Sequence, residues 1–409
     1  MKYQKKLLTE LGFVSRGRSQ HRPRDDKQLY GGDYPFIQTG DVKEAGFHIL
    51  SYSQTYNEKG LAQSKLWDKD TLCITIAANI ADTAILSFPA CIPDSIVGFI
   101  ANPEESDVRY VKYMFDILQR EFQNISQGTS QDNLSVEKLL GIKFEVPKVE
   151  NQRRIADILS AYDDLIENNQ RQIKLLEEAA MRLYREWFVF MRFPGHESVR
   201  IVDGVPEGWE VKQINDVCLN CASGGTPSRK RREYWADGSV NWFKTQELVD
   251  SWLFDADEKI SEKGLENSSA KLFPENTIVM AIYASPTLGR LGILTKESTF
   301  NQAALGLVAN GDFVSYEWLY LKLFELRDKF NAIASGAGQQ NINVKIVQTK
   351  EIVVPSHDVM GKFTEIIHPY FEKQKNLTEQ IIYLQKARDA LLPRLMTDGV
   401  GLKLEGGTV

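Results

Sequence analysis

The fold of this chain is decided by a segment that occurs twice. Its first copy is Ile125-Ser126-Gln127-Gly128-Thr129-Ser130-Gln131-Asp132-Asn133-Leu134, which leads to Val146-Pro147. Its second copy, 208 residues later, is Ile333-Ala334-Ser335-Gly336-Ala337-Gly338-Gln339-Gln340-Asn341-Ile342, which leads to Val354-Pro355. A period this long excludes a solenoid, whose units run about 20 to 50 residues. The chain is therefore predicted to hold two similar domains in a pseudo-twofold arrangement.

The strands and helices around this segment are duplicated as well. Runs of aromatic and β-branched residues predict the strands, and a period of 3.6 residues predicts the helices. The predicted strands and their counterparts are 34–37 and 240–243, 71–76 and 277–280, and 97–102 and 305–310, and the helices are 109–124 and 317–331. Each half is thus predicted to be a mixed α/β domain, which places the chain in the α+β class.

After each Val-Pro the sequence predicts a long helix with a coiled-coil seam. From Ile155 the apolar positions step alternately by four and three residues, as the a and d positions of a heptad do. Two such helices in one chain are expected to pair as an antiparallel coiled coil. The predicted seam is Ile155, Leu159, Tyr162, Ile166, Asn169, Ile173, Leu176, Ala180, Leu183, Trp187 and Phe190 in the first helix, and Phe363, Ile367, Tyr370, Gln374, Leu377, Ile381, Leu384, Arg388, Leu391 and Leu395 in the second.

Polar residues interrupt this seam at three positions. Asn169 could set the register of the two helices, as a buried polar residue can, and Gln374 and Arg388 break the apolar pattern of the second helix. An alternative is that each helix covers only its own domain, but a seam of this length favours pairing. The predicted boundaries are 1–147 for the first domain, 148–193 for the first long helix, 194–355 for the second domain, and 356–409 for the second long helix and tail.

Composition indicates an ordinary globular protein. Hydrophobic residues make up 43% of the chain and charged residues 25%. No run of 18 apolar residues is present, so we expect a cytoplasmic protein without a membrane span. The four cysteines are too few for a disulfide framework. Cys218-x-x-Cys221 lacks a second pair at ligand spacing, so we expect no metal site.

The sequence lacks the motifs that would indicate a methyltransferase, a cofactor-binding loop or a phosphate-binding loop. It lacks the Asn/Asp-Pro-Pro-aromatic tetrapeptide of an amino-methyltransferase, a Gly-x-Gly cofactor loop and a Gly-x4-Gly-Lys-Ser/Thr loop. Asp257-Glu258-Lys259 resembles part of a nuclease site, but it has no paired upstream acid and is interpreted as a solvated charge cluster. We therefore expect no catalytic residue and no cofactor bound by this chain. A self-sufficient methyltransferase or nuclease is the alternative, and methylation by the purified chain with S-adenosylmethionine would establish it.

Cationic side chains cluster at nearly corresponding places in the two halves, although the net charge is −6. Such side chains can neutralise phosphates, and an arginine can donate two hydrogen bonds to guanine. A charge run alone is usually solvated surface, but recurrence in an acidic chain favours contact with DNA. The candidates are Arg16, Arg18, Arg22, Arg24 and Lys27 in the first half, and Arg229, Lys230, Arg231 and Arg232 in the second.

Amide side chains in the duplicated segment are further candidates. They suit adenine N6 and N7 or phosphate oxygens, but a structural turn in which they cap the backbone is an equally good interpretation. They are Gln131, Asn133, Gln339, Gln340 and Asn341. Arg290 is another candidate, and Asp82 takes its place in the first half, which suggests that the two domains read different bases.

Four phrases of this sequence resemble those of a known family. They are Tyr34-Pro35-Phe36-Ile37-Gln38-Thr39-Gly40-Asp41, then Val146-Pro147 followed by Asn151-Gln152-Arg153-Arg154-Ile155-Ala156-Asp157-Ile158-Leu159, then Val205-Pro206-Glu207-Gly208-Trp209-Glu210, and Gly224-Gly225-Thr226-Pro227-Ser228. In order, spacing and duplication the chain resembles the DNA-specificity subunit of Type I restriction–modification systems, over essentially its whole length.

The resemblance implies two target-recognition domains that each read one half of a bipartite, asymmetric site in double-stranded DNA. It implies that two modification subunits dock on the helical region and methylate adenine with S-adenosylmethionine. It also implies restriction subunits, so that ATP and magnesium are expected on partners rather than on this chain. A coiled-coil scaffold that assembles proteins without touching DNA is the remaining alternative.

The long helices are expected to act as a ruler that sets the distance between the two half-sites. A helix of about 36 residues is roughly 54 Å long, and half-sites read from one face of DNA lie about 34 Å apart. We therefore predict a gap of about five to eight base pairs. Deleting one heptad from each helix should shorten it.

Overall fold

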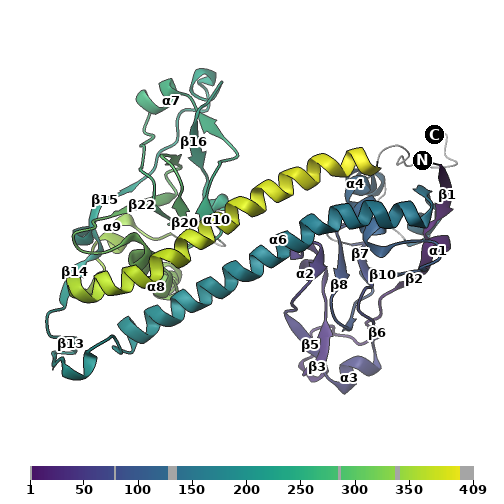
Figure 1. The fold of residues 1–409 in the computed structure, drawn as a ribbon, viewed down its shortest axis with the longest axis horizontal. Helices are drawn as coiled ribbons and strands as arrows, with labels where there is room; N and C mark the ends of the chain where they lie inside the picture. The colour runs from purple at the N-terminus through teal and green to yellow at the C-terminus, as the bar shows by residue number, and fades with distance from the viewer. Residues whose placement is uncertain (1, 78–79, 128–135, 284–286, 337–340, 397–409) are drawn as a thin grey trace. The chain divides into compact units, whose positions relative to one another are not determined.

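The computed structural model describes the chain except residues 1, 78–79, 128–135, 284–286, 337–340 and 397–409. The chain forms two compact units, one of residues 1–168 with 381–409 and one of residues 169–380. Each long helix contributes to both units. These helices are α6, Val149–Tyr184, and α10, His357–Met396 (Figure 1). The compact units therefore divide the chain within the long helices rather than at their ends.

Within its described residues, the first unit forms three sheets. A five-stranded sheet has the order β2-β10-β7-β8-β4, a four-stranded sheet the order β5-β3-β9-β6, and β1 pairs with β11. Its strands are β1 Tyr3–Leu7, β2 Gly12–Arg16, β3 Tyr30–Phe36, β4 His48–Ile49, β5 Gln54–Tyr56, β6 Leu66–Trp67, β7 Leu72–Thr75, β8 Thr83–Leu86, β9 Ala90–Cys91, β10 Ile96–Ala101 and β11 Lys143–Pro147. Its helices are α1 Leu8–Leu11, α2 Thr39–Glu44, α3 Glu58–Ala62, α4 Val108–Gln127 and α5 Val136–Gly141, with a short 3-10 turn at Lys27–Leu29.

The central strand β7 shows no alternation of buried and exposed residues because both of its faces are covered. Leu72 and Ile74 pack into the cluster that contains Tyr110 of α4. Cys73, between them, points to the opposite face and packs with Trp67. A strand buried on both sides reads as a continuous hydrophobic run, and all four residues of β7 are buried.

The second unit repeats this architecture. Its five-stranded sheet has the order β15-β22-β19-β20-β17, its smaller sheet the order β18-β16-β21, and β14 pairs with β23. Its strands are β12 Ile201–Val202, β13 Val205–Pro206, β14 Glu210–Gln213, β15 Cys218–Ser223, β16 Val240–Phe243, β17 Ser251–Leu253, β18 Lys259–Ile260, β19 Ile278–Ala281, β20 Leu291–Leu294, β21 Thr299–Phe300, β22 Ala304–Ala309 and β23 Glu351–Val354. Its helices are α7 Glu262–Glu266, α8 Tyr316–Gly336 and α9 Val344–Gln348, with short 3-10 turns at 196–198, 214–217, 232–234 and 245–247.

Equivalent packing constraints recur in the two domains, as the duplication predicts. Gly98 in the middle of β10 lies so close to Trp67 that an added Cβ would meet its ring at 2.5 Å. Gly306 in β22 is equivalent, because an added Cβ would meet the rings of Phe300 and Phe273 at 2.6 and 2.7 Å. Both glycines let a large aromatic side chain cover the sheet. The two mixed α/β domains predicted from the sequence are therefore confirmed.

In the first unit, the end of α10 packs against the start of α6 and also against the domain core. Ile155 and Leu159 lie in the same apolar cluster as Met396. Further along α6, Asp163 binds Arg388, so the residue numbers of the two helices run in opposite directions. The predicted lapse at Arg388 is thus a paired residue, and the seam and the domain-covering face of α6 coincide here.

In the second unit the same two helices also run antiparallel. Asn169 Nδ2 donates to Gln380 Oε1 at 3.2 Å, and the rings of Trp187 and Phe363 lie 5.7 Å apart. Asn169 is buried, and Gln380 is the partner it meets on the facing helix. The predicted antiparallel direction is therefore confirmed within each unit.

The apolar seam ends earlier than predicted. The α-helix stops at Tyr184 and continues as a π-helix over Arg185–Val189, whose wider turn shifts the phase of the side chains. Trp187 and Phe188 therefore point inward, whereas Phe190 is 56% exposed. The prediction that Phe190 belongs to the seam is wrong.

Arg388 is predicted to stabilise the first unit through a buried acid. Asp163 is 2% exposed and accepts hydrogen bonds from Arg388 and from the hydroxyl of Tyr113. Arg388→Met should cost about 3 kcal/mol of unfolding free energy, the low end for breaking a buried pair, because Arg388 keeps partial exposure. Adding Asp163→Asn should restore most of it, since the amide still accepts from Tyr113. Urea unfolding measures both, and equal stability of the single variant and wild type would contradict this role.

Among the described helices, none has both the length and the apolar character needed to cross a membrane.

Candidate nucleic-acid interface

Three of the predicted basic residues of the first domain, Arg16, Arg22 and Arg24, contact Asp94. Arg24 makes two hydrogen bonds to the Asp94 carboxylate, at 2.7 and 2.9 Å, and Arg22 lies 3.5 Å from it. Arg16 donates to the Asp94 backbone carbonyl, and the guanidinium of Arg18 binds Gln20. One carboxylate therefore orients two exposed guanidinium groups, and the cluster keeps an excess of positive charge.

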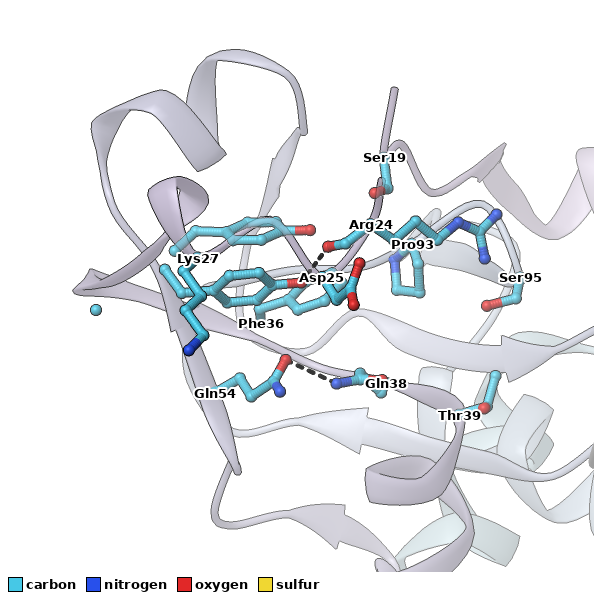
Figure 2. A pocket seen from close by; sticks show the side chains of 13 residues that line it. Ser19, Arg24, Asp25, Lys27, Phe36, Gln38, Thr39, Gln54, Pro93 and Ser95 are labelled. Atoms are coloured by element: carbon cyan, nitrogen blue, oxygen red, sulfur yellow. Dashed lines mark hydrogen bonds between the residues drawn. The ribbon is translucent and has the colours of Figure 1, made fainter. Parts of the chain in front are cut away.

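Next to this cluster the first domain has a cavity of about 660 Å³ (Figure 2). The rings of Phe36 and Tyr56 are stacked with centroids 4.1 Å apart and form part of its lining. Gln38 and Gln54 lie on another side, where Gln38 Nε2 donates to Gln54 Oε1 at 2.8 Å. The remaining lining residues are Ser19, Arg24, Asp25, Lys27, Tyr30, Gly31, Thr39, Pro93 and Ser95. The cavity thus combines a rigid aromatic stack, hydrogen-bonding amides and cations.

The basic loop of the second domain is arranged differently. The Arg229 guanidinium lies 3.6 Å from the ring centre of Trp235 and 4.9 Å from that of Trp242, and it forms an ion pair with Glu258. Lys244 Nζ lies 3.1 Å from the other oxygen of Glu258. The hydrogen bond from Arg229, and then that from Lys244, hold the pKa of Glu258 below its usual value. Asp257 and Lys259 are exposed, as the interpretation of a solvated charge cluster predicts, whereas Glu258 is partly buried and is held by Arg229 and Lys244.

The other cations of this loop differ in their engagement. Arg231 Nη1 donates to the hydroxyl of Tyr234 at 2.9 Å and lies 4.0 Å from Glu233. Lys230 and Arg232 are exposed, and within the described ranges no ion pair is found for either. These two side chains have the freedom that phosphate contacts require.

The structure leaves most of the predicted amide contacts outside its described residues. Gln131, Asn133, Gln339 and Gln340 all fall there. Asn341 is described, is exposed, and forms an isolated bridge with Tyr283. These five residues therefore stay predictions.

Asp82 and Arg290 occupy equivalent places, as the sequence comparison predicts. The amide of Thr75 donates to the carbonyl of Asp82, and the amide of Ala281 donates to that of Arg290. Burial raises the pKa of Asp82, whose carboxylate accepts from Gln119 Nε2 at 2.6 Å. The half-buried Arg290 has no ion pair within the described ranges. The two domains thus present opposite charges at the same hairpin.

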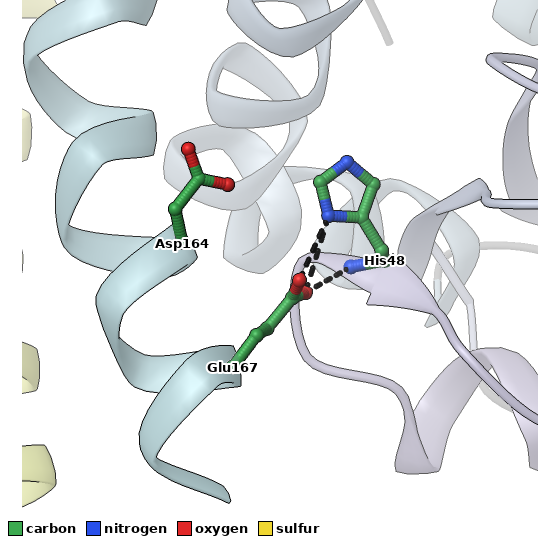
Figure 3. A group of neighbouring side chains, drawn as sticks. All are labelled: His48, Asp164 and Glu167. Atoms are coloured by element: carbon green, nitrogen blue, oxygen red, sulfur yellow. Dashed lines mark hydrogen bonds and ion pairs between the residues drawn. The ribbon is translucent and has the colours of Figure 1, made fainter. Parts of the chain in front are cut away.

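One group of described side chains has the composition of a metal site, but its members bind each other and tie a helix to a strand. We call the pair of His48 and Glu167 the His48 clamp. His48, Asp164 and Glu167 bring their ligand atoms within 4.8 Å of one another (Figure 3). Glu167 accepts from the backbone amide of His48 at 2.8 Å and faces its Nδ1 at 3.0 Å. The ring nitrogen nearest the acids is therefore already used, and the pair ties α6 to β4. All four cysteines, Cys73, Cys91, Cys218 and Cys221, are free thiols.

The His48 clamp is predicted to weaken as the pH rises. Burial alone lowers the pKa of an imidazole, but the hydrogen bond and charge of Glu167 outweigh it, and the pKa of His48 is raised. A raised folded pKa gives a stability contribution that is full below about pH 6.5, the unfolded value, and is lost as the pH passes the folded pKa. The stability difference between wild type and His48→Gln in urea should therefore shrink between pH 6 and 8.5. Glu167→Gln should remove the same pH dependence, and a constant difference across this range would contradict the clamp.

Gln38, Gln54, Lys244 and Glu258 were not among the residues predicted to bind DNA. The sequence held a signal for two of them, because Gln38 lies in the phrase Tyr34–Asp41 and Lys244 follows the counterpart of this phrase in the second half. Small differences in strand spacing between the halves shift these positions away from a constant offset of 208 residues, so a comparison at that offset does not align them.

Comparison with known proteins agrees with this architecture. A family model described as the Type I restriction modification DNA specificity domain matches residues 2–178 and 206–384. The MjaIX specificity subunit of Methanocaldococcus jannaschii is 26% identical over 410 residues, covering 96% of this chain and 92% of the relative. The HindI specificity subunit of Haemophilus influenzae is 24% identical, covering 94% and 97%.

The fold also matches a solved structure, the S subunit of the Type I restriction–modification system of M. genitalium. The TM-score is 0.62 at 16% identity, over 97% of this chain and 96% of that one. The two matches of the family model fall on the two duplicated domains and their following helices. The chain belongs to the family of Type I restriction–modification DNA specificity proteins.

Proposed function

We propose that this chain is the DNA-recognition subunit of a Type I restriction–modification complex, in which each domain reads one half of a bipartite, asymmetric target. The observation that carries this proposal is the repetition of one fold with different side chains. The five-stranded sheets of the two domains have the same strand order, and both domains present cations beside the smaller sheet. Equal scaffolds with unequal polar groups suit two half-sites of different sequence.

The long helices support a second part of the proposal, in which they set the gap between half-sites and dock two modification subunits. The α6 helix has 36 residues, which corresponds to about 54 Å, longer than the roughly 34 Å of one DNA turn. The remaining length leaves room for partners. These partners and the restriction subunits would carry S-adenosylmethionine, ATP and magnesium, and the chain itself would supply no catalytic group. We place this role in the cytoplasm, with the DNA it recognises.

Exchanging one domain tests independent reading. Residues 1–147 are replaced by the corresponding domain of another specificity chain, and the hybrid is expressed with its modification subunit in a host that lacks the system. We expect the methylated motif of the host DNA to change in one half only, because each domain has its own core and its own polar site. Modification-sensitive sequencing provides the motif. A change in both halves, or a wild-type chain that directs no motif, would contradict the proposal.

A further inference from the structure

The strand pairing fixes which residues of the two small sheets are equivalent. The middle strands β3 and β16 each pair in parallel on one side, with β9 and β21, and antiparallel on the other, with β5 and β18. Phe36 of β3 is opposite Gln54. At the same place, the amide of Trp242 in β16 donates to the carbonyl of Glu258 at 3.0 Å. Gln54 and Glu258 therefore occupy the same position in the two domains.

Gln38 in the first domain and Lys244 in the second are also equivalent, because the same hydrogen bond fixes the backbone at both residues. Two residues after Phe36, the amide of Gln38 donates to the Asp41 carboxylate at 2.7 Å. In the second domain the amide of Lys244 donates to the Glu247 carboxylate, also at 2.7 Å. Each acid caps the start of a short helical turn, α2 in the first domain and residues 245–247 in the second. The backbone is fixed alike in both domains, so the difference between them lies in the side chains.

At these equivalent positions the side-chain pairs differ in chemistry. Gln38 and Gln54 form a neutral amide pair at 2.8 Å, and both are exposed beside the cavity of Figure 2. Lys244 and Glu258 form an ion pair at 3.1 Å, which Arg229 extends. The first pair offers donors and acceptors together. The second group separates them, with donors on the cations and acceptors on the acid.

We propose that these two pairs each read one base pair of the bipartite target: Gln38 and Gln54 an A·T pair, and Lys244 with Arg229 and Glu258 a G·C pair. This inference rests on the proposed function and names the residues that make its two half-sites different.

The chemistry of the base edges supports this assignment. In the major groove adenine presents an acceptor at N7 and a donor at N6, and thymine an acceptor at O4. One glutamine amide can meet adenine, and after the bond between the two amides the second still has N–H groups for thymine. Guanine presents two acceptors, N7 and O6, and cytosine a donor at N4. Lys244 or Arg229 suits guanine and Glu258 suits cytosine, whereas the adenine N6 donor would oppose the cations.

The surroundings of both pairs suit contact with DNA. Arg24 and Lys27 line the same cavity as the two glutamines. In the second domain Lys230 and Arg232 lie in the same loop as Arg229 and carry no ion pair within the described part of the chain. Phosphate contacts position a protein on the duplex and base contacts specify the sequence, and each site holds both kinds of group.

The test exchanges the two chemistries in the full chain, expressed with its modification subunit in a host without the system. Lys244→Gln with Glu258→Gln should change one position of the second half-site from G·C to A·T or to no preference, and leave the first half-site intact. Gln38→Lys with Gln54→Glu should make the opposite change in the first half-site. We expect the preference at that position to fall by about 5- to 150-fold, the range for one good base contact.

The matched control replaces an exposed ion pair elsewhere in the second domain. Arg200→Gln with Glu207→Gln removes a pair at 3.3 Å and should leave the motif unchanged. The unaltered half-site reports in each variant that the complex still folds and assembles. If one double variant fails to fold, the other, in a separate domain, still decides the question.

The outcomes separate the inference from the proposed function. A wild-type motif that lacks A·T in the first half or G·C in the second would overturn the inference, as would double variants that direct the wild-type motif. A wild-type complex that shows no sequence preference at all would overturn the proposed function on which the inference rests.

Discussion

Inserting one heptad into each long helix should lengthen the preferred gap between half-sites by about three base pairs. Seven helical residues add about 10.5 Å at 1.5 Å per residue, and one base pair occupies about 3.4 Å. On the wild-type target the variant should lose at least about 100-fold in affinity, because it can engage one half-site only and each lost base contact costs about 1–3 kcal/mol. A DNA library that varies the gap between fixed half-sites measures the preferred length.

The structure indicates where the heptads should be placed. The boundaries between the two compact units fall after Asn168 in α6 and after Gln380 in α10. These points face each other, because the side chain of Asn169 donates to that of Gln380. Insertions there keep every residue of a unit with its own unit. The deletions suggested by the sequence, residues 170–176 and 378–384, would instead remove partly buried seam residues such as Ile173 and Ile381.

A three-heptad insertion serves as the control for helical phase. Three base pairs turn DNA by about 100°, since one turn takes about 10–10.5 base pairs, so the one-heptad variant should bind its best target less tightly than wild type. Three heptads add about 31.5 Å, close to the roughly 34 Å of one turn, and should recover affinity at a gap about nine base pairs longer. The same preferred gap in all three chains would exclude the helices as the ruler.

The duplicated fold could be predicted because strands buried on both faces leave a strong local pattern. The run at Leu72–Thr75 and its counterpart at Ile278–Ala281 are buried throughout, and both form central strands. The end of the first seam could not be predicted, because Trp187 and Phe190 fit one heptad pattern equally well. Only the change to a π-helix separates them, and tertiary packing around Trp187 and Phe188 accompanies it.

The polar sites were harder to predict because their partners are distant in sequence. Arg229 was recognised as a cation, but its pairing with Glu258 depends on strand β18 lying beside β16. Gln38 and Gln54 carry no charge, and although Gln38 lies in the phrase Tyr34–Asp41, composition and spacing give neither residue any weight. They stand out only when strand pairing aligns them with Lys244 and Glu258. Sequence comparison found the scaffold, and the geometry was needed to find the differences built on it.

Removing two exposed cations from the basic loop of the second domain should weaken DNA binding in a salt-dependent way. Lys230→Gln with Arg232→Gln removes two exposed charges that no acid of the described chain neutralises. If each contacts one phosphate, the slope of log K against log salt should become shallower by about 1.8, or 0.9 per contact. Affinity near 0.1 M salt should then fall by about 60-fold and approach the wild-type value as salt nears 1 M. Equilibrium binding from 0.05 to 0.5 M salt measures the slope.

A neighbouring acid provides the control of opposite sign. Glu233 is exposed and lies 4.0 Å from Arg231, so Glu233→Gln removes a charge that repels phosphate and leaves Arg231 less restrained. This variant should bind more tightly at low salt, with no change in the base preference of either half-site, because phosphate contacts carry no sequence information. An unchanged salt slope in Lys230→Gln with Arg232→Gln would place the loop away from the DNA backbone. A changed motif would instead mean that these cations touch bases. The assignment of Lys230 and Arg232 to phosphates, and of Lys244 and Glu258 to bases, would then be wrong.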